Sequence, residues 1–276
     1  MQGAADHPRK TIAIFLMLTF ALSAVTWVPQ IREGKLDPIW VTATMWSPGI
    51  AAILTKLITQ RDLRGMGWMP KPGKLLGLAY VLPILYALPV YLLAWTVGLG
   101  TFDEGKWIVA PGLSPPVGLL IIASAGLFTS LLSALGEEIG WRGLLVPELT
   151  RLTSFRNTAL ISGGIWAAWH MPLLFAADYH GQGTPILYSM ACFVAMVLAI
   201  SIIMAWITLK SGSLWPAAML HAAHNLFVQG VFDSATVADD RTNYLTGEFG
   251  IGLVITIAIA AFLLIRMYPI VPKEPT

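Results

Sequence analysis

Eight stretches of the chain are apolar over about 18–25 residues each, the length that the hydrocarbon core of a bilayer demands of a helix. We therefore predict an all-α fold: a polytopic membrane helix bundle of about eight transmembrane helices, forming a single integral-membrane domain over residues 1–276. The predicted spans are 11–29, 39–59, 75–99, 113–136, 158–176, 186–209, 214–232 and 249–268.

The composition excludes a soluble protein. Hydrophobic residues make up 56% of the chain and charged residues 12%, with a mean hydropathy of +0.71. A soluble domain carries about 25% charged residues, so this chain could not cover a wet surface with polar groups. The formal net charge of +2 is too small to indicate nucleic-acid binding. The single Cys192 lies among apolar residues, which excludes an internal disulfide and fits a packing role.

Positive charge is unequally distributed between the segments that connect the spans. With the N-terminus in the cytoplasm, 13 of the 17 basic residues fall in inner segments and four in outer segments. Basic residues accumulate on the cytoplasmic side of membrane proteins, so the distribution predicts that both termini are cytoplasmic. The four outer basic residues are Arg32, Lys35, Lys106 and Arg241.

The first span has some features of a signal peptide, because Arg9 and Lys10 precede an apolar run that contains Ser23. That run continues to Val28, which is longer than the core of a typical signal peptide. We expect a retained signal-anchor, with a cleaved leader as the alternative.

Polar side chains inside the predicted spans indicate a function. Ionisable groups at membrane depth cost a few kcal/mol each, so they usually face a protein interior or a water cavity. A carboxylate, imidazoles and an amide are also the groups that activate water and stabilise an oxyanion, which indicates an enzyme that works within the membrane. The candidates are Glu137, Glu138, His170, His221 and Asn225.

The two adjacent glutamates are expected to have different roles, because neighbouring residues on a helix point about 100° apart. Glu138 and Arg142 are four apart and can pair on one face, which leaves Glu137 free to face a cavity as a base. The alternative is that both glutamates merely end the fourth span in water. Segment 137–157 is expected to run along the inner membrane interface or dip into it, as amphipathic stretches do.

The histidines carry two further predictions. Pro172 should bend the helix beside His170 and open room there, although a lone histidine is more often a packing residue. His221 and Asn225 are four apart, hence on one face and about 6 Å apart along the axis, whereas His224 points partly elsewhere. The alternative for this pair is hydrogen bonding that holds helices together. By these spans, His170 lies deeper in the membrane than Glu137.

Three motifs occur in order within residues 113–230. They are Glu137-Glu138-x-x-x-Arg142, an aromatic residue four before a histidine (Trp166 and His170), and His221-x-x-x-Asn225. Together they resemble the motifs of the CPBP intramembrane protease family. That family includes type II CAAX prenyl proteases and bacteriocin-processing or immunity proteins, the ABI group. It usually has phenylalanine where this chain has Trp166.

The resemblance implies an endopeptidase in which Glu137, helped by His170, activates a water, while His221 and Asn225 stabilise the oxyanion. Glu138, Arg142 and Trp166 would support them. The substrate would be a peptide or protein, prenylated CAAX-type peptides included, cleaved near the cytoplasmic face. We expect an integral protein of a prokaryotic inner membrane, in contact with lipids.

The cofactor remains open between none and zinc. Glu137, His170 and His221 are a plausible zinc set with an open position. The sequence lacks the His-Glu-x-x-His spacing that places two ligands and a base on one helix. We therefore favour a mechanism without metal.

Two other functions compete with proteolysis. A non-catalytic membrane binding or immunity protein of the same family would keep the motif residues for structural reasons. A proton-coupled transporter could use the buried histidines and glutamate as a relay. Transporters commonly have repeated halves with paired broken helices, and the sequence shows no such symmetry.

Overall fold

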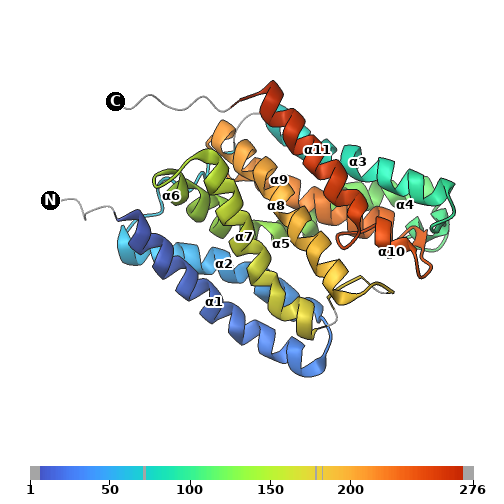
Figure 1. Ribbon diagram of the computed structural model, residues 1–276, viewed down its shortest axis with the longest axis horizontal. Coiled ribbons are helices and arrows are strands. Elements are labelled where there is room, and N and C mark those ends of the chain that lie inside the picture. Colours follow the sequence, from blue (N-terminus) through green and yellow to red (C-terminus); the bar gives the residue numbers. More distant parts are fainter. Residues whose placement is uncertain (1–6, 71–72, 178, 182, 270–276) are drawn as a thin grey trace.

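Long helices make up most of the molecule, as the computed structural model shows for residues 7–70, 73–177, 179–181 and 183–269 (Figure 1). Six of them are unbroken α-helices, which confirms the predicted all-α fold. These are α1 (Pro8–Glu33), α2 (Pro38–Thr59), α3 (Gly73–Thr96), α7 (Phe155–Ala176), α8 (Ile186–Ser211) and α11 (Ile251–Met267).

Two further rods are built from shorter segments that follow one another without a break. One runs over Pro115–Thr150 and the other over α9 and η4. The first rod consists of α4 (Pro115–Ile121), the π-helical η2 (Ile122–Gly126), α5 (Leu127–Gly140), the π-helical η3 (Trp141–Leu145) and α6 (Val146–Thr150). The second consists of α9 (Trp215–His224) and the π-helical η4 (Asn225–Asp233).

Short elements lie in the connections. The 3-10 helix η1 (Glu104–Trp107) and α10 (Thr242–Leu245) each form about one turn. Strands β1 (Thr101–Phe102) and β2 (Thr236–Val237) pair antiparallel, with Thr101 opposite Val237.

In the part of the chain that the structure describes, six helical rods are long and apolar enough to cross a membrane. They are α1, α2, α3, the Pro115–Thr150 rod, α7 and α8. The other two predicted spans correspond to the α9–η4 rod and to α11, which has 17 residues. A count of eight crossings and cytoplasmic termini therefore remain predictions.

Local chemistry sets several helix boundaries. The Asp37 side chain accepts hydrogen bonds from the backbone N–H groups of Ile39 (3.0 Å) and Trp40 (3.1 Å), which satisfies the free donors at the start of α2. Gly34 ends α1 with φ +66°, a left-handed conformation that glycine adopts at little cost. The Ser154 hydroxyl caps α7 in the same way as Asp37 caps α2.

The helix ends define two faces of the bundle. In Figure 1 the first turn of α1 lies at the left and the last turn of α11 at the top, so both are on the upper-left side of the bundle, whereas the α1–α2 and α7–α8 connections lie towards the bottom. We call these the terminal face and the loop face. Described connections at the terminal face are 60–70, 151–154 and 212–214. Those at the loop face are 34–37, 97–114, 177, 179–181, 183–185 and 234–250.

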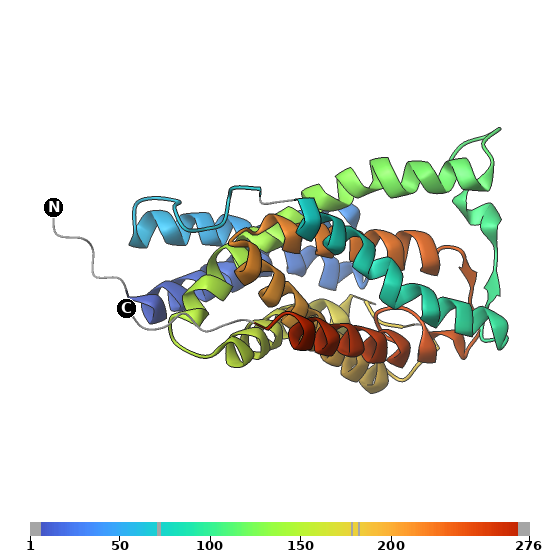
Figure 2. The ribbon, with the colours of Figure 1, turned by 90° about the horizontal axis from the view of Figure 1, so that it is seen from above.

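Segment 137–157 does not follow its predicted path. The helix continues through Thr150 (Figure 2). Trp141–Val146 is buried inside the protein rather than lying along the interface. The Trp141 indole packs edge-on against Phe15 and Trp169, with ring centroids 5.6 and 5.8 Å apart. The prediction was wrong for Trp141–Val146, because it treated the whole segment as amphipathic, whereas the buried charge of Arg142 is paired with Glu138 in the same helix. The glutamates therefore lie inside a rod instead of at its end.

Close packing of α2 on α5 positions this rod. A Cβ atom at Gly49 would lie 2.4 Å from the carbonyl oxygen of Gly136, the residue before Glu137. We expect Gly49→Ala to destabilise the fold by about 1–3 kcal/mol, because neither backbone can yield without moving its helix. The matched control is Gly77→Ala in α3, where an added Cβ meets nothing within 4 Å. Thermal unfolding in detergent should separate the two variants, and equal midpoints would contradict this packing.

Candidate active site

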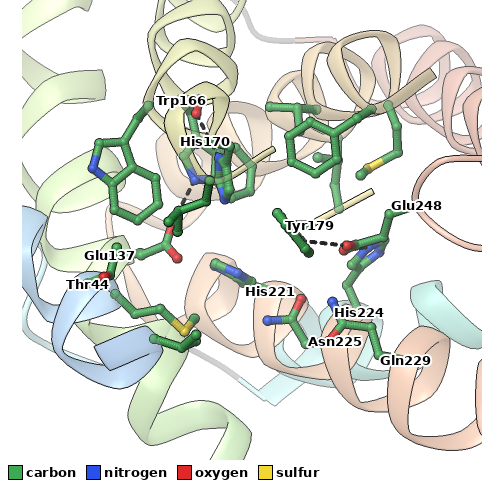
Figure 3. A pocket seen from close by; sticks show the side chains of 18 of the residues that line it. Thr44, Glu137, Trp166, His170, Tyr179, His221, His224, Asn225, Gln229 and Glu248 are labelled. Carbon is green, nitrogen blue, oxygen red and sulfur yellow. Dashed lines mark hydrogen bonds and ion pairs between the residues drawn. The ribbon is translucent and has the colours of Figure 1, made fainter. Parts of the chain in front are cut away.

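The structure brings the four predicted catalytic residues to one cavity of about 180 Å³. Glu137 comes from α5, His170 from α7, His221 from α9 and Asn225 from the first residue of η4 (Figure 3). The predicted difference in depth between Glu137 and His170 disappears, because Glu137 lies within a continuous rod rather than at its inner end. Three separate rods therefore supply one polar site.

Glu137 is held by two indoles. It is 2% exposed, and its Oε2 atom accepts hydrogen bonds from Trp166 Nε1 (2.6 Å) and Trp141 Nε1 (3.2 Å). Hydrogen bonds to a carboxylate are short and strong, so they fix the orientation of the group. Trp166 thus does more than preserve an aromatic ring, since phenylalanine has no such donor.

Glu138 faces away from the cavity and forms a buried network. Its Oε1 atom accepts a hydrogen bond from Arg142 Nη1 (2.9 Å), the predicted pair, and another from His221 Nδ1 (2.9 Å). The Arg142 guanidinium also lies over the Trp166 ring, 4.4 Å from its centroid. A carboxylate can only accept here, so the Nδ1 atom of His221 carries hydrogen and its Nε2 atom is left for other partners.

His170 also has an assignable proton. Its Nδ1 atom lies 2.9 Å from the backbone carbonyl oxygen of Trp166, and a carbonyl can only accept. Nδ1 therefore donates, and in the neutral ring Nε2 is free to accept a proton. Pro172 lies inside α7, which is helical on both sides of it.

Asn225 begins the π-helical segment η4 and lines the cavity beside His221 (Figure 3). Single π-helical turns inside α-helices often mark functional sites, because the wider turn changes the direction of the side chains that follow. Both groups of the His221…Asn225 pair therefore reach the same space. Their position in the cavity favours the chemical interpretation of the pair over helix–helix adhesion alone.

A second polar cluster in the same cavity was missed by sequence reasoning. His224 Nε2 lies 3.0 Å from Glu248 Oε1, and the Tyr179 hydroxyl donates to Glu248 Oε2 at 2.9 Å. The Tyr86 hydroxyl lies 2.6 Å from His224 Nδ1. Gln229 also lines the cavity and bonds to Glu248. His224 was visible as a spare histidine, but Tyr179 and Glu248 come from distant connections and carry no spacing signal.

Burial and hydrogen bonds together set the protonation states of Tyr179 and Glu248 in this second cluster. Burial, and then the charge of Glu248, raise the pKa of Tyr179 well above its usual value, so the phenol stays protonated and donates. Burial alone would raise the pKa of Glu248, but hydrogen bonds from His224, Tyr179 and Gln229 and the charge of His224 outweigh it and lower that pKa. Glu248 is therefore an ionised acceptor.

Glu137, His170 and His221, the candidate zinc ligands, line the same cavity. Among the described residues, no three histidine, cysteine, aspartate or glutamate side chains are grouped closely enough to hold a metal ion. His221 directs Nδ1 to Glu138, and Glu137 Oε2 accepts from two indoles. Such contacts are compatible with either prediction, none or zinc, because metal-ligating histidines also donate their second ring N–H to a carboxylate or a carbonyl.

The part of the chain that holds these residues is similar to known proteins. Residues 119–227, which include all four cavity residues of the three motifs, match the model of the Rce1-like type II CAAX prenyl endopeptidases. The chain is 34% identical over 88 residues to CAAX prenyl protease 2 of Methanococcus maripaludis. That match covers 31% of this chain and 32% of the relative, so it spans about a third of the relative's length. In the region that holds the three motifs, the chain is therefore similar to type II CAAX prenyl endopeptidases.

Proposed function

We propose that this protein is an intramembrane endopeptidase that hydrolyses a peptide bond with a water activated by Glu137 and His170. The observation that carries the proposal is the convergence of a carboxylate, two imidazoles and an amide on one largely buried cavity. Such a set supplies, at the same place, a base, a second group that can accept a hydrogen bond from the water, and hydrogen-bond donors for the oxyanion. The same groups spread over separate surfaces could not act on one bond.

In the proposed reaction, a water lies between the Glu137 carboxylate and His170 Nε2. Glu137 takes a proton from the water, and the water oxygen attacks the carbonyl carbon of the peptide bond. The carbonyl oxygen becomes an oxyanion, which accepts hydrogen bonds from the Asn225 amide and from His221 Nε2. When the C–N bond breaks, Glu137 returns the proton to the leaving amine.

His221 can donate from Nε2 only when its ring is protonated on both nitrogens. The Glu138 carboxylate at Nδ1 favours this form, because it stabilises positive charge on the ring. Glu138 is thus a positioning residue, and Arg142 fixes Glu138 in turn.

The walls of the cavity indicate a membrane-associated peptide as the substrate. Apart from its polar groups, the cavity is lined by apolar side chains, which suits a peptide with hydrophobic residues or an attached lipid such as a prenyl group. These side chains are Leu36, Val41, Met45, Leu173, Phe193, Met196, Val197 and Ile200. We place the protein in a prokaryotic cell membrane.

Asn225→Ala is expected to lower kcat by about 10²–10³-fold with little change in KM, because the amide acts mainly on the oxyanion of the transition state. The test is purified protein in detergent with a panel of prenylated and plain fluorogenic peptides. Asn157→Ala is the control, because Asn157 lies exposed in the first turn of α7. An Asn225→Ala variant with unchanged kcat would remove Asn225 from the proposed oxyanion site.

Chelators are expected to leave the rate unchanged, because the proposed reaction uses no metal. Purified enzyme would be dialysed against EDTA and assayed before and after addition of Zn²⁺. Loss of activity on dialysis, restored by Zn²⁺ and not by buffer alone, would contradict a metal-free mechanism.

A further inference from the structure

The rod that carries His221 and Asn225 changes its helix type at the site. It is α-helical up to His224 and π-helical over Asn225–Asp233. A π-helix is rare and mostly a single turn, so a run of nine residues needs support from its surroundings. The Asn225 amide must stay free to donate to the oxyanion, and its direction therefore depends on what holds this turn of the helix.

The start of η4 is held through the His224 imidazole, which has a partner on each ring nitrogen. Its Nδ1 atom lies 2.6 Å from the hydroxyl of Tyr86 in α3, and its Nε2 atom lies 3.0 Å from Glu248 Oε1. The ionised Glu248 can only accept, so Nε2 carries hydrogen and donates. All three side chains are buried. Turning the ring would leave buried polar groups without a partner, which is costly.

The other end of η4 is held by a second tyrosine of the same helix. Asp233 Oδ1 accepts a hydrogen bond from the Tyr91 hydroxyl (2.5 Å), whose oxygen accepts another from the backbone N–H of Gly247 (3.1 Å). Tyr86 and Tyr91 both lie in α3, and Gly247 and Glu248 are consecutive residues of the connection before α11. Both ends of the π-helical segment are therefore attached to the same two elements, α3 and this connection.

The His224 ring and the Asn225 amide point to different sides of the rod. Neighbouring helix residues are about 100° apart, so a ring directed at Glu248 leaves the amide beside His221, as Figure 3 shows. Because His224 and Asn225 share a peptide bond, a rotation of the helix that displaces one side chain also displaces the other. A displacement of about 1 Å at a catalytic group can lower a rate by about 10²-fold.

The contacts of His224 and Glu248 favour positioning over chemistry. Both residues line the cavity, but their polar atoms are directed at each other and at two phenols. Both ring nitrogens of His224 are engaged, so the imidazole is not a free base. Glu248 accepts from His224 at Oε1 and from the Tyr179 hydroxyl at Oε2. What these contacts fix is the ring next to Asn225.

We propose that Glu248 is a positioning residue for the proposed hydrolysis. It holds the His224 ring, which fixes the start of η4 and thereby directs the Asn225 amide at the oxyanion. Tyr86 holds the same ring from α3. This inference rests on the proposed peptidase function. It assigns to Glu248 and Tyr86, which lie outside the three motifs, the geometry on which the third motif depends.

The kinetic test is a double-variant cycle between Glu248→Leu and Asn225→Ala. Glu248→Leu alone should lower kcat by about 10–10²-fold with little change in KM, because the oxyanion donor is misplaced. Glu248→Gln should keep most of the activity, because its side-chain oxygen can still accept from His224. In the Asn225→Ala background, Glu248→Leu should lower kcat by less than about threefold, because the group that it positions is already gone. Effects that multiply, or a change confined to KM, would overturn the inference.

Tyr86→Phe tests the same link with little risk to the fold, because it removes one hydroxyl and Tyr86 does not line the cavity. It should lower kcat by about three- to tenfold. The matched control is Tyr80→Phe in the same helix, which removes a hydroxyl that donates to the carbonyl oxygen of Ala123 and should keep wild-type kcat. Thermal unfolding in detergent confirms that both variants are folded. Equal kcat values for the two would overturn the inference.

The direction of residue 225 is also measured without any need for activity. In a Cys192→Ala background, Asn225→Cys places a thiol in the cavity, and its alkylation by iodoacetamide is timed. Adding Tyr86→Phe should slow the alkylation at least about threefold, because the thiol turns away from the cavity, whereas adding Tyr80→Phe should not. An unchanged rate with Tyr86→Phe would overturn the inference. Absence of hydrolysis in the wild-type protein would instead count against the proposed function and leave the alkylation result standing.

Discussion

Glu137→Gln is expected to lower kcat for peptide hydrolysis by about 10²–10⁴-fold, because an amide cannot take a proton from the attacking water. The fold should survive the change, since the glutamine oxygen can still accept from the Trp166 and Trp141 indoles. The measurement is kcat on the best peptide of the panel, together with thermal unfolding in detergent.

Glu148→Gln is the matched control for Glu137→Gln. Glu148 lies on the same rod, pairs with Arg151 at 3.1 Å and does not line the cavity. It should hydrolyse peptide at the wild-type rate. Wild-type hydrolysis by folded Glu137→Gln would contradict the proposed mechanism. A non-catalytic binding or immunity role would predict that its biological function persists in this variant.

Arg142→Met is expected to destabilise the protein by about 3–5 kcal/mol, because the buried Glu138 carboxylate loses its guanidinium partner and keeps only the hydrogen bond from His221 Nδ1. Arg142 and Glu138 are both buried, with 2.9 Å between Nη1 and Oε1. The double variant Glu138→Met/Arg142→Met should recover much of this stability, because no unpaired charge remains. Thermal or denaturant unfolding in detergent measures all three proteins.

The same double variant should nevertheless remain a poor enzyme, because His221 has lost the acceptor at Nδ1 that favours its donating form. Recovered stability with kcat still reduced at least about tenfold would separate positioning from folding. Arg151→Met is the control, since its pair with Glu148 is partly exposed and such pairs contribute about 0–1 kcal/mol. A double variant as active as wild type would contradict the positioning role of Glu138.

Much of the fold was predictable because hydropathy and length act locally. Each long helix overlaps a predicted apolar span, and the i, i+4 spacing correctly paired Glu138 with Arg142. The path of 137–157 was not predictable in the same way. Its burial depends on contacts of Trp141 with Phe15 and Trp169, which lie far away in the sequence.

The candidate site was likewise predictable only where it depends on local sequence. Hydropathy placed Glu137, His170 and the His221…Asn225 pair on three different spans, but their meeting in one cavity depends on how those helices pack. The link from His221 to Glu138 joins residues 83 positions apart and follows from no local pattern. The lining residues Tyr179 and Glu248 likewise come from connections between helices, whose sequences carry no periodic signal.

The most direct test of the central claim, that Glu137 activates a water instead of attacking the peptide itself, is a single turnover in H₂¹⁸O with enzyme in excess over peptide. The mechanism predicts that the new carboxylate of the product contains one ¹⁸O atom after that turnover. Product without ¹⁸O, with the label found in the side chain of residue 137, would show a covalent acyl-enzyme and contradict the account.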